Sequence, residues 1–296
     1  MTDRNRPKVF AKGKPGKIEA RRPGDVATPS RPAAYERWNA GIRAAGDVGD
    51  NVITMYDVIG DDPWTGGGVT AKRVAAALRA IGARDIEVHL NSPGGDMFEG
   101  IAIYNLLREH PGRVTVKVVG LAASAGSIIA MAGDEIQMGA ASFLMIHNCW
   151  VMAVGNRHDM LETAAWLEPF DAAMAEVYAT RSGQPVASVI GWMEASRGDG
   201  TYFGGTQAVE LGLADSLLAS DAVTEDVAAR EQGKARSALN IAELALCKEH
   251  PRSEARAILS QIKGKPDAAR DTAAKPDAGG TSWVGAAADL LASIKI

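Results

Sequence analysis

The stretch "VVGLAASAGSIIAMAG", residues 118–133, joins an apolar run to a series of small residues that contains two serines, Ser124 and Ser127. Glycine and alanine carry little side-chain volume, so the backbone here can pack closely against another segment. The stretch continues the predicted strand "RVTVKVVG" (113–120) and is expected to turn into a helix. A helix leaves its first N–H groups unpaired. Either serine can therefore cap this helix or act as a nucleophile beside those donors.

The segments on both sides of this stretch alternate between strand and helix patterns. Strands are predicted at 51–60, 85–95 and 113–120, with two short ones within 134–148, and helices at 70–82 and 98–112. Further helices are predicted at 157–181, with Pro169 as a kink or junction, at 186–195 and at 206–215. This alternation indicates an α/β fold, in which right-handed βαβ crossovers build a mostly parallel sheet.

Composition divides the chain into three parts. Residues 1–34 carry nine Lys or Arg and three Asp or Glu, although the whole chain has a net charge of −4. We expect a flexible basic arm at 1–48, a folded domain at 49–220, and an Ala- and charge-rich helical extension with a linker at 221–296. The arm is interpreted as a solvated tail, with binding to nucleic acid or an acidic surface as the alternative.

The two cysteines, Cys149 and Cys247, form neither a disulfide framework nor a zinc site, and they suit a reducing compartment. The basic N-terminal segment is not followed by the apolar run of a secretory signal. No apolar run is long enough for a membrane span. We therefore expect a cytoplasmic protein that does not contact a membrane and needs no metal or organic cofactor.

Three motifs could carry chemistry. The first, "NSPGGDMFEG" (91–100), places two glycines between a strand and a helix, where their N–H groups can face an anion or form a tight turn. The second is Ser124, with its alternative role as a helix cap. The third, "FLMIHNCW" (143–150), ends an apolar strand on His147, a possible general base or a structural histidine. Each motif alone has a structural explanation.

Taken together, the motifs resemble the Clp protease proteolytic subunit family. "SPGG" is followed about thirty residues later by "GLAASAG" and about twenty further on by "MIHN". "EVYATRSGQ" resembles the end of that family's handle helix, and "QAVELGLAD" resembles its closing helix. The resemblance covers roughly residues 50–218 and implies a superhelix of βαβ units, shared with crotonases, from which a handle helix protrudes. The flanking segments resemble the subgroup of phage head-maturation (prohead) proteases.

The resemblance implies a serine endopeptidase that hydrolyses peptide bonds through an acyl-enzyme. Ser124 matches the family's nucleophile, and His147 matches its general base. Asp199 in "RGDGTYF" matches the third triad member, although its spacing to the next helix is about one residue longer than usual. Glu194 is the alternative acid.

The same resemblance implies backbone contacts to the substrate. The N–H groups of Gly94 and Ala125 match the oxyanion hole, which stabilises the developing negative charge. Gly95, Asp96 and Met97 match the segment that pairs an extended substrate as an added strand.

The family also implies a homo-oligomeric ring that stacks through the handle helix and encloses its active sites. The phage subgroup implies capsid and scaffold precursors as substrates, in the host cytoplasm and within the prohead. Whether the enzyme is independent of ATP or is assisted by an unfoldase partner of the AAA+ class is left open.

Three other interpretations compete with this one. A crotonase-type enzyme acting on acyl-CoA shares the fold and the backbone oxyanion hole, but it does not need the Ser124–His147 pair. A Ser-Lys protease of the signal-peptide-peptidase type would use a lysine base, for which Lys72 and Lys117 are the nearby candidates. A structural protein on an inactive protease fold would need neither serine nor base.

Overall fold

The computed structural model describes residues 16–17, 32–46, 49–62, 67–219, 222–247 and 250–263. Contacts divide the chain into two compact units, Met1–Asp226 and Val227–Ile296. The predicted C-terminal linker and most of the basic arm lie outside the described residues, as does the last stretch of the chain after residue 263.

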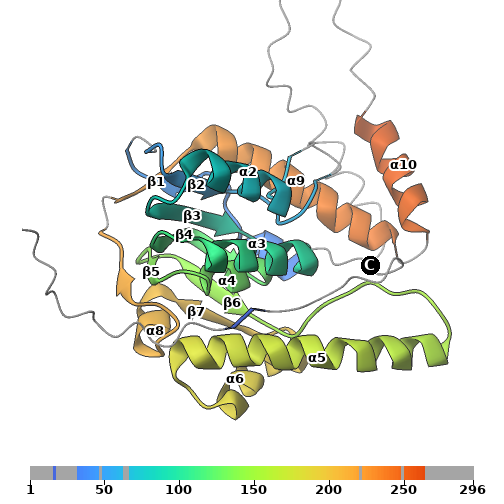
Figure 1. Cartoon of the computed structure of the whole chain (residues 1–296). Helices are drawn as coiled ribbons and strands as arrows, with labels where there is room; N and C mark the ends of the chain where they lie inside the picture. Colours follow the sequence, from blue (N-terminus) through green and yellow to red (C-terminus); the bar gives the residue numbers. More distant parts are fainter. Residues whose placement is uncertain are drawn as a thin grey trace, which may run out of the picture. The chain divides into compact units, whose positions relative to one another are not determined.

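The core of the first unit is a seven-stranded, mostly parallel sheet (Figure 1). Its strands are β2 (Val52–Met55), β3 (Ile86–Ser92), β4 (Val114–Ala123), β5 (Glu135–Met138), β6 (Phe143–Ile146), β7 (Thr201–Gly204) and β8 (Ser216–Leu217). The main order is β2-β3-β4-β5-β8, with β6 paired to β4 and β7 paired antiparallel to β6. The central strands β3 and β4 are mostly buried, as expected for a parallel sheet whose two faces are both covered. The predicted α/β fold is confirmed.

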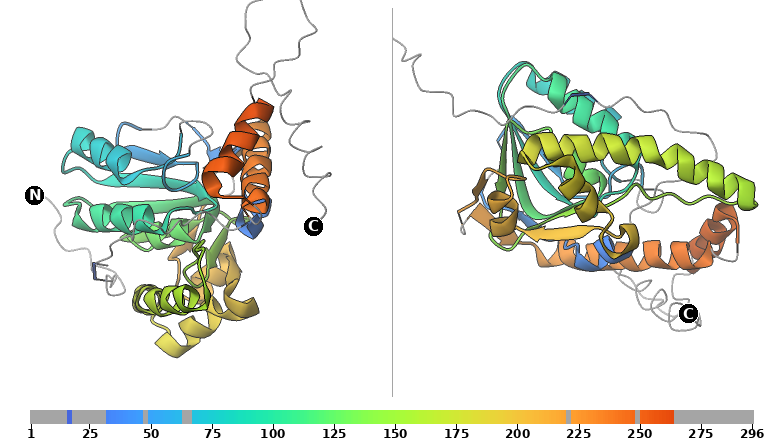
Figure 2. Two further views of the ribbon diagram at one scale, coloured as in Figure 1. Left: turned by 90° about the vertical axis from the view of Figure 1, so that its right-hand side faces the viewer. Right: turned by 90° about the horizontal axis from the view of Figure 1, so that it is seen from below.

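Three helices lie along the sheet. They are α2 (Ala71–Ile81), α3 (Met97–Glu109) and α4 (Ala125–Ala130). Two views show α2 and α3 on the same face of the sheet (Figures 1 and 2). The helix α2 begins where the Thr70 hydroxyl accepts a hydrogen bond from Arg73 N at 3.3 Å, which satisfies one of the unpaired N–H groups of the first turn.

The long central strand β4 has two partners on the same side. Its first part, Thr115 to Val118, pairs with β5, and its last part, Leu121 to Ala123, pairs with β6. The strand β6 therefore runs beside the carboxyl end of β4. As a result, the residues that follow these two strands are brought together at one edge of the sheet.

The helix α5 (Arg157–Ser182) extends well beyond the sheet (Figures 1 and 2). It begins with a capping box between Asn156 and Asp159 and runs continuously through Pro169. Its first half is mostly exposed, whereas its second half is mostly buried. It is followed by α6 (Val186–Met193), α7 (Ala195–Gly198) and α8 (Gly205–Glu210).

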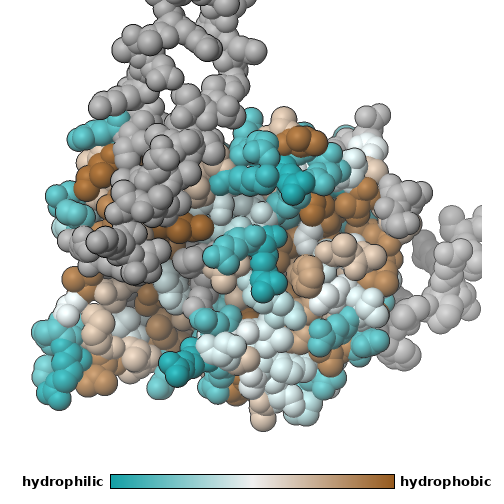
Figure 3. All heavy atoms as spheres, turned by 180° about the vertical axis from the view of Figure 1, so that it is seen from behind, coloured by the Kyte–Doolittle hydropathy of each residue, from teal (hydrophilic) through white to brown (hydrophobic). Residues whose placement is uncertain are grey.

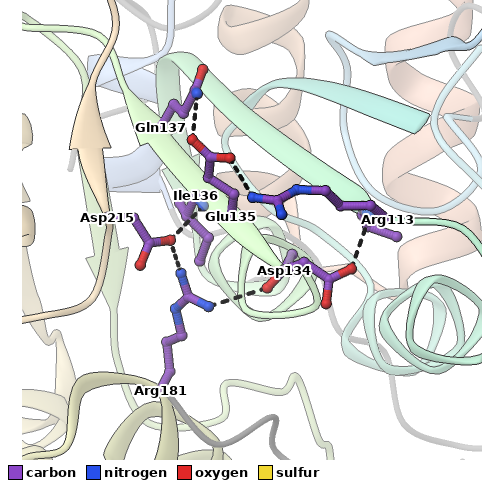
Figure 4. A network of polar contacts seen from close by, with 9 residues as sticks. Arg113, Asp134, Glu135, Ile136, Gln137, Arg181 and Asp215 are labelled. Atoms are coloured by element: carbon purple, nitrogen blue, oxygen red, sulfur yellow. Dashed lines mark hydrogen bonds and ion pairs between the residues drawn. The ribbon is translucent and has the colours of Figure 1, made fainter. Parts of the chain in front are cut away.

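A polar network holds the end of α5 against the edge of the sheet (Figure 4). The guanidinium of Arg181 donates to Gly133 O at 3.2 Å and pairs with the carboxylate of Asp215. The same carboxylate accepts a hydrogen bond from Ile136 N at 2.7 Å. Because Arg181 is only 2% exposed, its charge must be paired to be tolerated there. The network thus fixes where α5 meets the strand β5.

The segment before the sheet forms regular elements as well. The short helix α1 (Pro32–Arg37) is followed by β1 (Ile42–Ala44), which pairs antiparallel with β9 (Val223–Glu225). Trp38 is buried, and its indole N–H donates to Asn91 O at 3.0 Å. The helix α1, Trp38 and the strand β1 lie within the range 1–48 that was expected to be a flexible arm. They have regular structure because the apolar side chains of this segment are buried against the sheet.

The second unit contains two described helices, α9 (Val227–Leu246) and α10 (Arg252–Lys263). They are linked by a hydrogen bond from Arg256 Nε to Glu243 Oε1 at 2.9 Å. The contact division after Asp226 lies close to the predicted end of the central domain at residue 220.

The surface opposite to the view of Figure 1 mixes hydrophilic and hydrophobic side chains (Figure 3). Among the described residues, no helix combines the length and the apolar character needed to span a membrane.

Candidate active site

Ser124 occupies a sharp turn between β4 and α4. Its φ of 55° and ψ of −122° lie outside the regions that residues other than glycine normally adopt. Its N–H donates to Met145 O at 3.0 Å, and its carbonyl accepts from Ser127 N at 2.9 Å. Backbone strain of this kind persists only where surrounding contacts hold it, and it is common at active sites.

His147 lies directly beside Ser124. Each residue follows the end of its strand by one position, and the two strands pair so that Ala123 faces Met145. His147 Nε2 lies 2.7 Å from Ser124 Oγ. The imidazole is nearly buried, at 7% exposure for the residue. A hydroxyl in hydrogen-bond contact with an imidazole is the arrangement in which a serine can be activated as a nucleophile.

Asp199 lies in the turn that leads from α7 into β7 and is exposed. The turn leads back to the end of β6, next to His147, because Thr201 pairs with Ile146. Gly200 packs so tightly there that a Cβ on it would lie 2.0 Å from Ile146 O and 2.4 Å from His147 Cβ. The backbone of Asp199 is therefore adjacent to His147. The alternative acid, Glu194, is also exposed and lies between α6 and α7.

The two glycines of the "SPGG" motif have different contacts. Gly94 packs against Ser124, since a Cβ on it would lie 2.7 Å from Ser124 Cβ. The Gly94 N–H donates to Ser92 Oγ at 3.1 Å. Gly95 and Ala125 line the same pocket as Ser124. Within the described part of the chain, no acceptor is found for the N–H groups of Gly95 and Ala125.

Asp96 serves mainly to start α3. Its Oδ1 accepts hydrogen bonds from Phe98 N at 2.9 Å and Glu99 N at 3.1 Å. Its N–H donates to Ile59 O at 2.8 Å, and its carbonyl accepts from Gly100 N at 3.0 Å. Its backbone polar groups are thus already used within the chain.

Comparison with known proteins identifies the family of this chain. The model of the Clp protease family matches residues 69–221, a range that includes all the candidate site residues. The chain is 32% identical over 145 residues to the ATP-dependent Clp protease proteolytic subunit 2 of Chlamydia muridarum, covering 48% of this chain and 70% of that relative. The chain belongs to the Clp protease family.

A second relative agrees with this family. The ATP-dependent Clp protease proteolytic subunit 3 of Rhodococcus jostii is 30% identical over 157 residues, which cover 51% of this chain and 75% of that relative. Among solved structures, a mutant form of ClpP1 from Listeria monocytogenes is similar with a TM-score of 0.47 and 18% identity. That similarity covers 61% of this chain and 94% of the Listeria chain.

In this Clp protease family member, the pocket beside Ser124 and His147 is largely apolar. Its lining comes from α3, α4, the segment after β6, and the second half of α5. The apolar lining residues are Met97, Ile128, Trp150, Met174 and Tyr178. Such a pocket favours an apolar side chain, because burying its surface releases water.

The segment after His147 is held by a residue that the sequence motifs did not reveal. The carboxylate of Asp171 in α5 accepts hydrogen bonds from Asn148 Nδ2 at 3.0 Å and from Cys149 N at 2.6 Å. Burial, reinforced by the charge of Asp171, raises the pKa of the Cys149 thiol. Cys149 therefore stays protonated and is a poor nucleophile, although it lines the pocket.

Within the ranges that the structure describes, no group of three or more His, Cys, Asp or Glu side chains is arranged to hold a metal ion.

Proposed function

We propose that this protein is a serine endopeptidase with Ser124 as nucleophile and His147 as general base. The observation that carries the proposal is the 2.7 Å contact between Ser124 Oγ and His147 Nε2 at a strained strand-to-helix turn. The named relatives are proteolytic subunits of Clp proteases, which supports peptide-bond hydrolysis as the reaction.

The reaction proceeds in two stages through an acyl-enzyme. His147 Nε2 takes the proton of Ser124 while Oγ attacks the peptide carbonyl carbon, and a tetrahedral oxyanion forms. His147 then gives this proton to the leaving amine as the C–N bond breaks. Water, deprotonated by the same imidazole, releases the acid product and restores Ser124. Asp199 acts as the third member, which holds the imidazole tautomer and stabilises the imidazolium.

The oxyanion is stabilised by the N–H groups of Ala125 and Gly95. The family resemblance implied Gly94 as the second donor, but the Gly94 N–H is donated to Ser92 Oγ. Gly95 lines the pocket together with Ser124 and Ala125, which supports its N–H as the donor. Two such donors aimed at the developing charge lower the barrier substantially.

Substrate binding uses the segment Gly95–Met97 and the apolar pocket. Met97 lines the pocket, so the substrate side chain before the scissile bond contacts it. The polar groups of Asp96 are occupied by Ile59 and by the start of α3, which leaves this residue a supporting role.

The quaternary state and the biological role belong to the same proposal. The exposed first half of α5 carries apolar residues such as Leu161, at 61% exposure, which suits helix packing between copies in a ring. The segments that flank residues 69–221 support a phage head-maturation protease that cuts capsid and scaffold precursors in the host cytoplasm, with or without an unfoldase partner.

Two measurements test the catalytic assignment. A fluorophosphonate probe should label the wild type at Ser124, and the Ser124→Ala variant should lose labelling and about 10⁴-fold or more of its peptidase activity. Ser142→Ala is the matched control, because it removes another buried serine hydroxyl, in the loop before β6. This variant should still be labelled at Ser124, as the wild type is. Full activity of Ser124→Ala would refute the proposal. An acyl-CoA enzyme of the crotonase type would not label at all.

The biological role is tested by mass. Wild-type protein and Ser124→Ala are expressed in parallel, and their intact masses and native sizes are compared. Self-trimming of the flanking segments in the wild type alone would support processing of assembly proteins, and identical masses would argue against self-trimming.

A further inference from the structure

Two buried hydroxyl groups lie directly behind the nucleophile. Ser127, on α4, is fully buried, and Tyr178, on the second half of α5, is 2% exposed. Ser127 Oγ lies 2.7 Å from Tyr178 OH and 2.6 Å from Ser124 O. Three oxygens thus form a continuous chain from the long helix α5 to the backbone of Ser124.

The direction of the hydrogen bonds in this chain follows from proton counting. The carbonyl of Ser124 can only accept, so the single hydroxyl proton of Ser127 is directed to Ser124 O. Ser127 Oγ therefore accepts from Tyr178, whose hydroxyl is the donor. Burial raises the pKa of the Tyr178 phenol, which keeps this donor protonated at any working pH.

The acceptor at the end of the chain belongs to the catalytic machinery. Ser124 O and the N–H of Ala125 are part of the same trans peptide unit, which is planar. In a trans unit the carbonyl and the N–H point in opposite directions. Fixing Ser124 O from behind therefore fixes the direction in which the Ala125 N–H points into the pocket. A hydrogen bond to the carbonyl also polarises the unit and strengthens the N–H as a donor.

We propose that Ser127 and Tyr178 are positioning residues, which form a hydroxyl relay that orients the peptide unit between Ser124 and Ala125 toward the oxyanion. The proposal rests on the proposed function of Ser124 and adds to it the group that aims its oxyanion donor. It also assigns a specific role to Ser127, for which the sequence left only packing or capping once Ser124 matched the family's nucleophile. Because the relay begins on α5, it couples that helix to the nucleophile.

The test compares Ser127→Ala, Tyr178→Phe and the double variant with wild type. Tyr178→Phe keeps the ring that lines the pocket, so KM should stay within about twofold while kcat falls about fivefold. Ser127→Ala should lower kcat about 30-fold, since losing an oxyanion donor outright costs about 10²-fold or more. Labelling of Ser124 by the fluorophosphonate should slow by the same factors, because it uses the same oxyanion site.

Matched controls separate this role from loss of a buried hydroxyl as such. Tyr104→Phe removes the hydroxyl of another buried tyrosine, which donates to Gly16 O at 2.9 Å. Ser142→Ala removes another buried serine hydroxyl. Both should leave kcat within about twofold.

The double variant gives the sharpest result. In Ser127→Ala the buried Tyr178 donor loses its acceptor, so adding Tyr178→Phe should cost nothing more and can recover part of the loss. Effects that multiply, a change in KM instead of kcat, or losses no larger than those of the controls would overturn the relay. If the wild type itself fails to label, the proposed function fails, whereas normal wild-type labelling with unaffected variants refutes only the relay.

Discussion

Two regions of this molecule hold residues other than glycine in a left-handed backbone, and they do so by different means. Ser124 has a φ of 55° inside a buried turn, where both its N–H and its carbonyl are hydrogen-bonded. Ser196 and Arg197 have φ values of 54° and 65° in the exposed turn before Asp199. The first conformation is enforced by the packing around it. The second depends on a few local contacts, such as Gly200 N to Ala195 O at 2.9 Å.

The difference indicates how the two halves of the site are built. Ser124 and His147, the proposed nucleophile and base, are positioned by the pairing of β4 and β6, and little freedom remains there. Asp199, the proposed acid, is carried by a turn at the surface, and the backbone of this turn reaches His147 through the pairing of β6 and β7. Strain held by a core is expensive to disturb, whereas strain at the surface can be relieved without consequence for the core.

The largest expected effect tests whether Asp199, in the exposed turn, is part of the catalytic site. Asp199→Ala should lower kcat by about 10⁴-fold, because the imidazole loses the carboxylate that sets its tautomer. Glu194→Ala, the matched change of the other candidate acid, should stay within about twofold. Steady-state kinetics with a fluorogenic peptide measure both. If Asp199→Ala loses less than about tenfold, the turn is not part of the triad.

The next effect tests how closely the buried turn is packed. Gly94→Ala should lower kcat about 100-fold, since its Cβ would lie 2.7 Å from Ser124 Cβ and would displace the nucleophile. Gly183→Ala is the control, because Gly183 also has a positive φ, of 72°, but has no heavy atom within 4 Å of an added Cβ. It should keep full activity and lose only about 1 kcal/mol of unfolding free energy. Equal losses of kcat in the two variants would show that backbone strain, and not the contact with Ser124, lowers the activity.

A third experiment compares thiols in the two regions. Cys149 lies beside the buried turn and has a raised pKa, so the native protein should be alkylated by iodoacetamide at pH 8 at least about tenfold more slowly than an exposed thiol. The reference is Ser196→Cys in the exposed turn, with Cys247→Ser to remove the other thiol. Peptide mass spectrometry measures both rates. Fast alkylation of Cys149 would mean that water reaches its thiol in the pocket.

The same pKa shift has a consequence for stability. The folded state holds the Cys149 proton more tightly than the unfolded state does. The contribution of the protonated Cys149 thiol to the free energy of unfolding is therefore fully present below the thiol's unfolded pKa of about 8.5. This contribution is lost as the pH rises above that value.

The smallest effect concerns the surface strain itself. Arg197→Gly should raise the free energy of unfolding by about 0.5 to 1 kcal/mol, because glycine adopts a φ of 65° without the clash of a Cβ. The same type of change at an exposed helical position, Lys72→Gly, should lower it by about 1 kcal/mol. Denaturant titrations give both values. A destabilised Arg197→Gly would show that the Arg197 side chain, not its backbone, supports the turn.

The fold could be predicted from the sequence because the patterns that mark its strands and helices are local. The apolar runs at 85–95 and 113–120 and the helical spacing at 70–82 and 98–112 correspond to β3, β4, α2 and α3 within a few residues. The flexible arm was a weaker prediction, since Tyr35 and Trp38 are too few to show a period, yet they are buried on the sheet. Only the packed structure shows which face is available to receive them.

The sequence by itself pointed to Ser124 and His147 only through a resemblance, because "SPGG", "GLAASAG" and "MIHN" together match the Clp protease family in order and spacing, whereas each motif alone also has a structural explanation. The tertiary structure decided the contacts that join distant segments: β6 beside the end of β4, Asp171 on the segment after His147, and Tyr178 behind Ser127. It also distinguished the N–H of Gly94 from that of Gly95. Such contacts depend on strand register and helix placement, which no local pattern contains, because they arise only when the whole core packs.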